Sequence, residues 1–207
     1  MSTTYKEDDL VPSPSRGFAW TLIITGFIGL LASLTLTIEE IELYKNANQA
    51  LLCDINPLLS CSKVMVSEFG AILGFPNPLI GLGAFVAPIA VGVGVLAGAR
   101  FKPWFWRLFI FGIFAAFVFV FWLFLMTTFV VKFLCIFCMI TWAATIPLFW
   151  KVILWAMTED LIQVPQRAIP FAFKAYDNSY LFAIGTELLI AATIIWRFWD
   201  SWYLLFV

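Results

Sequence analysis

The sequence predicts an all-α membrane protein in which a four-helix transmembrane bundle is followed by a fifth transmembrane helix near the C-terminus. Of 207 residues, 63% are hydrophobic and only 12% are charged, and the mean hydropathy is +0.97. A soluble domain of this size could not bury so much apolar surface. Five apolar runs are long enough for a bilayer, which takes about 20 helical residues. They span residues 18–38, 79–99, 104–126, 129–150 and 181–199.

The runs divide the chain into four parts. Residues 1–17 are rich in Ser, Thr, Pro and charge, which favours a disordered cytoplasmic tail. Residues 18–156 contain the first four runs and a long outer loop, residues 39–77. Residues 157–179 are expected to form a polar cytoplasmic linker, and residues 180–207 the fifth helix and the C-terminus. The first run is too long for a cleavable signal peptide, so we expect the mature protein to keep it.

Basic residues near the helix ends predict the orientation, because short cytoplasmic loops carry an excess of Lys and Arg. With the N-terminus in the cytoplasm, the cytoplasmic side receives Lys6, Arg16, Arg100, Lys102, Arg107, Lys151, Arg167 and Lys174. The outer side receives only Lys45, Lys63, Lys132 and Arg197. We therefore expect a multi-pass protein of the plasma membrane whose loop 39–77 faces the periplasm or the cell exterior.

Local signals predict some structure within the outer loop. The acidic residues after the first run are expected to extend that helix into water: Glu39, Glu40 and Glu42. Asn56 followed by Pro57 is typical of a helix start, which predicts a short surface helix over residues 57–69 that stops at Gly70. Asn77 followed by Pro78 repeats this signal at the start of the second apolar run.

Four cysteines form two separate pairs. Cys135 and Cys138 make a CxxC motif in the fourth run, about 10 Å from Thr128 at its outer end by helical rise, and Cys53 and Cys61 lie in the outer loop. All four should therefore gather at one face. The Cβ atoms of side chains three positions apart on a helix are about 5–6 Å apart, whereas the Cβ atoms of a disulfide are about 3.8 Å apart. The CxxC pair should therefore require a local change in the helix before it can form a disulfide. Two dithiols beside each other suggest disulfide exchange and electron transfer.

Composition argues against several other functions. The net charge of −1 and the lack of a glycine-rich phosphate loop give no indication of nucleic-acid binding. The chain has no histidine, and a zinc site of four cysteines would leave the membrane pair unexplained, so we expect no metal. A membrane scaffold or small-solute transporter with a structural loop disulfide is the main non-enzymatic alternative. Transport is disfavoured because the sequence contains no internal repeat.

Two stretches carry a resemblance to a known family. CDINPLLSCSKVMVSEFGAILGFPNPLIGLG, residues 53–83, and CIFCMITW, residues 135–142, resemble the vitamin K epoxide reductase family, in particular its bacterial members that oxidise dithiols in the manner of DsbB. The resemblance implies a four-helix bundle around a quinone of the menaquinone or ubiquinone type. It also implies a separate DsbA-like thioredoxin-fold partner, with membrane lipid around the bundle. The implied alternative is a reductase of quinone or quinone epoxide that uses thiols only as its reductant.

The same resemblance implies roles for individual residues. Cys53 matches the loop cysteine that the partner attacks, Cys61 the one that passes electrons to Cys135, and Cys138 the thiolate that faces the quinone. From the residues alone Asn77 is a helix cap, but it matches the family's quinone-binding asparagine. Trp142 stands where many relatives have the tyrosine that contacts the second carbonyl. Glu187, in the fifth run, lies outside the resemblance.

Overall fold

The computed structural model describes residues 10–46, 51–55, 58–163 and 165–199, and in this part of the chain it contains helices and no strands. Five helices are long and apolar enough to cross a membrane. They are α1 (Arg16–Lys45), α3 (Asn77–Leu96), α4 (Pro103–Leu125) with its π-helical continuation η2 (Met126–Val131), α5 (Ile136–Thr158) and α7 (Ser179–Arg197). The prediction of an all-α membrane protein is confirmed.

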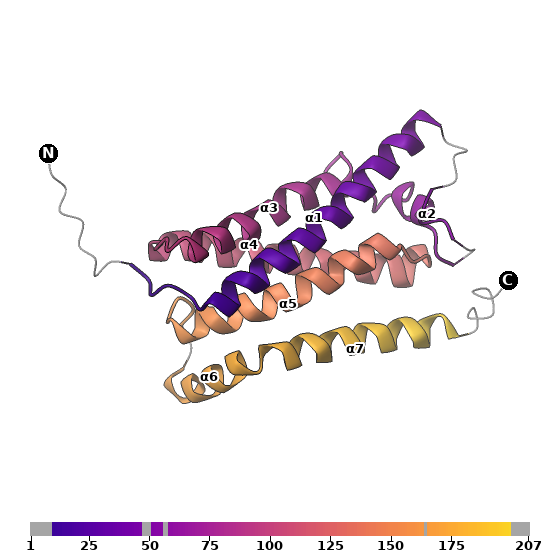
Figure 1. Ribbon diagram of the computed structural model, residues 1–207. Helices are drawn as coiled ribbons and strands as arrows, with labels where there is room; N and C mark the ends of the chain where they lie inside the picture. Colours follow the sequence, from indigo (N-terminus) through magenta and orange to yellow (C-terminus); the bar gives the residue numbers. More distant parts are fainter. Residues whose placement is uncertain (1–9, 47–50, 56–57, 164, 200–207) are drawn as a thin grey trace, which may run out of the picture.

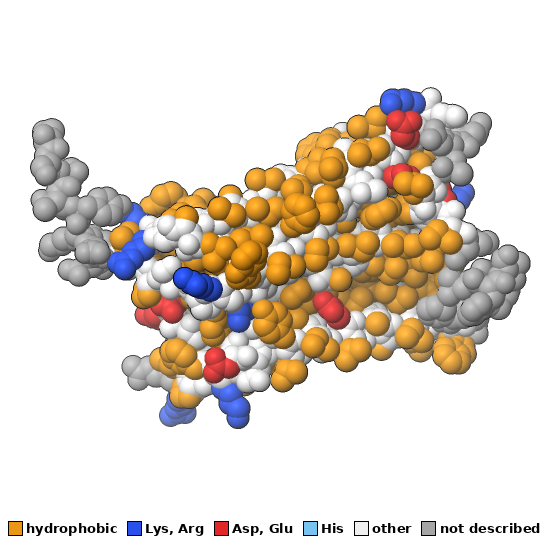
Figure 2. Space-filling view, in the orientation of Figure 1, with side chains coloured by type: hydrophobic (Ala, Val, Ile, Leu, Met, Phe, Trp, Pro, Cys, Tyr) orange, Lys and Arg blue, Asp and Glu red, His pale blue; other side chains and the backbone are white. Residues whose placement is uncertain are grey.

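Three short helices complete the structure. α2 (Cys61–Met65) lies in the loop after α1, and the 3₁₀ turn η3 (Gln166–Ala168) leads into α6 (Ile169–Asp177). Figure 1 shows the long helices side by side, with α2 at one end of the bundle and α6 at the other. We call these the cysteine end and the α6 end. Figure 2 shows apolar side chains along the length of the bundle and most charged side chains near its two ends, as expected for a membrane protein.

α5 occupies the centre of the arrangement. It packs against α1 and α4 within the bundle and against α6 and α7 outside it, while α3 packs against α1. Aromatic rings join three helices near the α6 end: Trp155 of α5 lies 5.0 Å from Phe18 of α1 and 4.4 Å from Trp106 of α4, centroid to centroid. α7 therefore lies against the outside of the four-helix unit, on α5.

α1 and α3 approach each other closely because small residues lie between them. A Cβ atom at Gly92 would lie 2.8 Å from the carbonyl oxygen of Ala19, and one at Gly26 would lie 2.8 Å from Ile89. These distances are shorter than ordinary van der Waals contacts, so only glycine fits at this spacing. The close contact fixes α3 against α1.

Several predicted boundaries were wrong. Residues 129–131, predicted to open the fourth membrane helix, end the third as part of η2, and α5 begins only at Ile136. The helix stops because Lys132 adopts a left-handed conformation with φ of 62°. The predicted surface helix 57–69 is reduced to α2 with Ser60 as its N-cap, and the predicted cap at Asn56 and Pro57 lies outside the described residues. The linker 157–179 contains α6.

The acidic end of α1 also differs from the expectation. The helix does continue to Lys45, and Glu42 forms an exposed ion pair with Lys45 at 2.8 Å. Glu39 and Glu40, however, are buried, with 7% and 3% of their surface exposed. The loop packs over this part of α1, so these two side chains face protein and not water.

Candidate functional site

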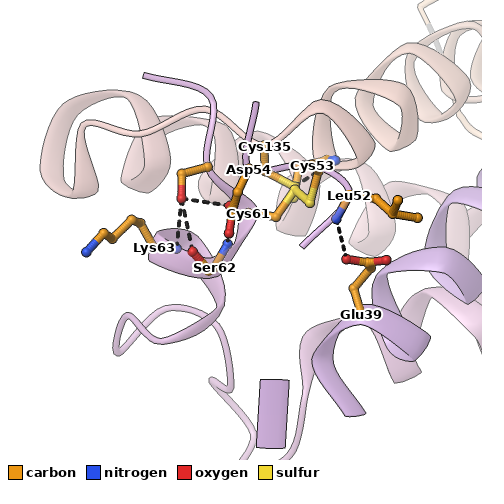
Figure 3. Close-up of a disulfide and its surroundings, with 10 residues drawn as sticks. Glu39, Leu52, Cys53, Asp54, Cys61, Ser62, Lys63 and Cys135 are labelled. Atoms are coloured by element: carbon orange, nitrogen blue, oxygen red, sulfur yellow. Dashed lines mark hydrogen bonds between the residues drawn. A yellow bond between two sulfur atoms is a disulfide. The ribbon is translucent and has the colours of Figure 1, made fainter. Parts of the chain in front are cut away.

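Cys53 and Cys61 form a disulfide at the cysteine end (Figure 3). Cys61 is the first residue of α2, and Ser60 caps that helix by accepting a hydrogen bond from the Lys63 N–H at 3.4 Å. Asp54, directly after Cys53, accepts hydrogen bonds from the Ser60 hydroxyl at 2.8 Å and the Ser62 N–H at 3.1 Å. The residues next to each cysteine are therefore bonded to each other, which holds the loop closed around the disulfide.

Two further contacts fix this loop on the bundle. The Glu39 carboxylate accepts a hydrogen bond from the Leu52 N–H at 2.9 Å, which ties the segment before Cys53 to α1 (Figure 3). Leu59 and Leu134 form a parallel β-bridge, in which Ser60 N donates to Leu134 O at 2.9 Å and Leu134 N donates to Leu58 O at 3.0 Å. The bridge brings the start of α2 beside the start of α5.

This register places Cys61 against Cys135. Their Sγ atoms are 3.1 Å apart, while Cys135 and Cys138 are both free thiols. Cys135 is not inside a helix but is the N-cap of α5, where its Sγ accepts a hydrogen bond from the Cys138 N–H at 3.3 Å. The expected local change in the helix is thus a complete break before Ile136. Cys53, Cys61 and Cys135 belong to one buried cluster that Cys138 contacts, so the predicted gathering of all four cysteines is confirmed.

A cavity of about 480 Å³ opens beside the CxxC motif. α1, α3, α4, α5 and the loop all contribute to its walls, which are mainly apolar. Cys135, Cys138, Asn77 and Trp142 line it together, so the structure brings the two sequence-predicted ligand residues and the two inner thiols to one space. Glu187 does not line this cavity; it is half-buried on α7.

Asn77 does not cap α3 with its side chain. It is the first residue of that helix, and the cap position belongs to Pro76 with no side-chain hydrogen bond. The Asn77 amide instead donates to the Phe69 carbonyl at 2.6 Å and accepts from the Ile72 N–H at 3.2 Å. The side chain therefore fastens the loop after α2 to the start of α3. Among the described residues, the second amide N–H has no further partner.

Trp142 is buried, with 3% of its surface exposed, one turn below Cys138 on α5. Its ring packs edge-on against Phe124 at a centroid distance of 5.3 Å. In the described part of the chain its indole N–H has no hydrogen-bond partner.

Three residues of the site were missed at the sequence level. Asp54 and Glu39 hold the loop, and Glu40 lines the cavity, with one carboxylate oxygen, Oε2, buried and without a hydrogen-bond partner in the described structure. A signal for Glu40 does exist, because it shares one helical stripe with Ser33 and Leu36, which line the same cavity.

Burial also revises the expectation for Cys53. A partner-facing thiol in a mobile segment should be accessible, yet only 1% of Cys53 is exposed. Its neighbours Leu52 and Ile55 are exposed, at 78% and 62%. The loop thus presents apolar side chains to its surroundings and keeps the disulfide beneath them.

Comparison with known proteins agrees with this geometry. Residues 20–153 match the model of the vitamin K epoxide reductase family. The chain belongs to this family. No curated protein matches the chain. As a member of the vitamin K epoxide reductase family, it is a membrane oxidoreductase that works with thiols and a quinone. The residues here fit a quinone ring, because the cavity has apolar walls, free thiols at one side and an amide N–H that can donate to a carbonyl oxygen.

Proposed function

We propose that the protein oxidises the dithiol of a separate thioredoxin-fold protein such as DsbA, and so supports disulfide-bond formation. Electrons pass from the partner to Cys53 and Cys61, then to Cys135 and Cys138. A quinone bound in the cavity accepts two electrons and two protons from this inner pair. The observation that carries the proposal is the 3.1 Å contact between the Sγ atoms of Cys61 and Cys135 beside that cavity.

The order of exchange follows from the contacts. A partner thiolate attacks Cys53 and releases Cys61, and Cys61 attacks Cys135 of the inner disulfide and releases Cys138. The partner's second thiolate then displaces Cys53, which attacks Cys61, re-forms the outer disulfide and releases Cys135. Each step breaks one S–S bond and forms another, so no electron is lost between pairs. In this relay, a joined outer pair beside two inner thiols is the arrangement expected once electrons have reached Cys135 and Cys138.

Local charge assists the inner cysteine. Cys135 caps α5, a helix of 23 residues, and the partial positive charge at a helix N-terminus favours an anion there. A thiolate is both the attacking and the leaving species in disulfide exchange. We infer that the N-cap position is the reason for the break in the helix before Ile136.

Partner access requires the loop to open. Cys53 is buried, and the described contacts that close the loop over it include the Glu39–Leu52 hydrogen bond, the hydrogen bonds of Asp54 and the Leu59–Leu134 bridge. We infer that the exposed side chains of Leu52 and Ile55 meet the apolar surface around the partner's dithiol, and that docking displaces this segment. We also infer that Asn77 and Trp142 hold the quinone, Asn77 by its free amide N–H.

Trapping experiments test the relay. A Cys53→Ala protein should accumulate a Cys61–Cys135 disulfide under oxidising conditions, detected by peptide mapping, because the two sulfurs already lie in contact. A Cys61→Ala protein should instead trap a mixed disulfide between Cys53 and a reduced thioredoxin-fold protein. If the trapped adduct requires Cys61 and survives loss of Cys53, the two roles are reversed.

Turnover tests the overall reaction. Purified protein should reduce a short-chain ubiquinone when a reduced thioredoxin-fold protein is added, and Cys138→Ala should abolish this reduction. If the quinone absorbance does not change in wild-type protein that holds quinone, the proposed function is wrong.

A further inference from the structure

Glu40 is the one carboxylate among the described residues that line the cavity. It projects from α1 on the same stripe as Ser33 and Leu36, with 3% of its surface exposed. Its Oε2 atom is buried without a hydrogen-bond partner in the described structure. No lysine, arginine or histidine is among the described lining residues, so no fixed cation balances the carboxylate there.

The neighbouring glutamates of α1 differ from Glu40 because their carboxylates have partners outside the cavity. Glu39 accepts a hydrogen bond from the Leu52 N–H, and Glu42 pairs with Lys45 in water. Only Glu40 is directed into the cavity with an uncommitted oxygen. An unpaired charge in apolar surroundings is costly, whereas a neutral carboxylic acid is not, so such a group is suited to take up and release a proton.

The proposed reaction needs a group of this kind. Conversion of the Cys135 and Cys138 thiols to a disulfide releases two protons, and reduction of a quinone consumes two. The other polar side chains of the cavity are already engaged or do not ionise: the hydroxyls of Thr127, Thr141 and Thr145 donate to backbone carbonyls. Asn77 has no ionisable group. Glu40 and the two thiols are thus the only titratable side chains among the described lining residues.

We propose that the Glu40 carboxyl group carries protons between the inner thiols and the quinone oxygens. Glu40 starts as the neutral acid and gives its proton to an oxygen of the quinone as the quinone is reduced; as carboxylate it then accepts the proton of the Cys138 thiol, which leaves Cys138 as a thiolate, and returns to the neutral acid. The Cys135 proton follows the same route, while two electrons leave the sulfurs as their S–S bond forms. Glu40 and Cys138 line the same cavity.

This inference rests on the proposed function, and its test separates the two. The full-length protein in detergent is supplied with dithiothreitol and a short-chain ubiquinone, and quinone reduction is followed by absorbance. Glu40→Gln keeps the size of the side chain but cannot carry a proton, so quinone reduction should slow about 100-fold, the usual contribution of one acid–base group. Exchange between Cys61 and Cys135, measured by trapping in a Cys53→Ala background, should keep its rate.

Two further measurements distinguish proton transfer from a structural role. Added formate, a small carboxylic acid, should restore part of the quinone reduction in Glu40→Gln, and Glu40→Asp should retain more activity than Glu40→Gln. Glu42→Gln, which alters an exposed glutamate of the same helix, is the matched control and should behave as wild type.

The possible results separate a failure of the Glu40 inference from a failure of the proposed function. Quinone reduction by Glu40→Gln at the wild-type rate overturns the inference and leaves the proposed function intact. Wild-type protein that reduces no ubiquinone overturns the proposed function itself. If Glu40→Gln does not fold, Glu40→Asp decides: slowed quinone reduction with unchanged thiol exchange supports proton transfer, and equal loss of both rates overturns it.

Discussion

Asp54 holds the two outer cysteines together by hydrogen bonds rather than by an ion pair. Burial opposes its ionisation, but hydrogen bonds to its carboxylate from Ser62, Ser60 and the backbone of Leu51 outweigh burial and hold the pKa of Asp54 below its usual value. The ionised form therefore belongs to the closed loop. Because opening the loop breaks these bonds, Asp54 links the protonation state of the loop to access to Cys53.

The pH dependence of loop opening follows from this shift. Since the pKa of Asp54 is lower in the folded than in the unfolded chain, its stabilisation of the closed loop is complete above the unfolded value of about 3.9. It is lost as pH falls through the lower, folded value. Reduction of the Cys53–Cys61 disulfide by a water-soluble phosphine should therefore accelerate in acid. In Asp54→Asn the rate at neutral pH should be higher and its acid dependence smaller; identical profiles would contradict this assignment.

Asn77 combines two tasks that substitution can separate. Its amide fastens Phe69 and Ile72 to α3, and its remaining N–H is available to a quinone carbonyl. Asn77→Ala should slow quinone reduction by about 100-fold or more, the usual cost of losing one donor to developing charge. Steady-state kinetics separates the two contributions of Asn77. A loosened loop raises KM, whereas loss of the hydrogen-bond donor lowers kcat. A change in KM alone would leave Asn77 as a structural residue.

At the scale of elements, glycine allows the close contact between α1 and α3. Gly92→Ala should destabilise the protein by about 1 to 3 kcal/mol, because its Cβ would meet the backbone oxygen of Ala19, which cannot move aside as a side chain can. Gly83→Ala, on the same helix with no heavy atom within 4 Å of the added Cβ, is the control. It should stabilise α3 slightly, by up to about 1 kcal/mol. Thermal unfolding in detergent measures both, and equal melting temperatures would contradict this packing.

The elements also show how far the sequence determines the site. Hydropathy located all five membrane helices, because their length and apolarity depend only on the bilayer. It could not locate the break before Ile136: residues 129–135 are as apolar as a helix, and the left-handed Lys132 and the Leu59–Leu134 bridge depend on contact with a distant loop. Burial of Glu39 and Glu40 was missed for the same reason. The gathering of the two cysteine pairs was predictable because disulfide exchange requires their sulfur atoms to lie close together.

Across the whole molecule, α7 is joined to the catalytic unit by specific polar contacts. The Trp150 indole N–H donates to the Thr186 hydroxyl at 3.0 Å, and Lys151 Nζ donates to the Ser179 hydroxyl at 3.2 Å. Many apolar side chains of α7 are exposed on the surface of the molecule, which suits a helix that faces lipid. Residues 20–153 match the family model, and α6 and α7, which pack on α5, lie beyond the matched residues.

The last prediction concerns the orientation of the whole molecule in the membrane. α1, α3, α4 and α5 cross the membrane before the linker, so the N-terminus and residues 157–179 share one side and the cysteine end lies on the other. We expect the first side to be the cytoplasm, where disulfides are kept reduced, and the cysteine end to face the oxidising compartment, because the basic residues are more numerous on the first side. A phosphatase reporter that needs disulfides for activity should be active when fused after Asn46 and inactive when fused after Ile162. The reverse pattern would place the four cysteines in the cytoplasm and exclude an envelope protein as the electron donor.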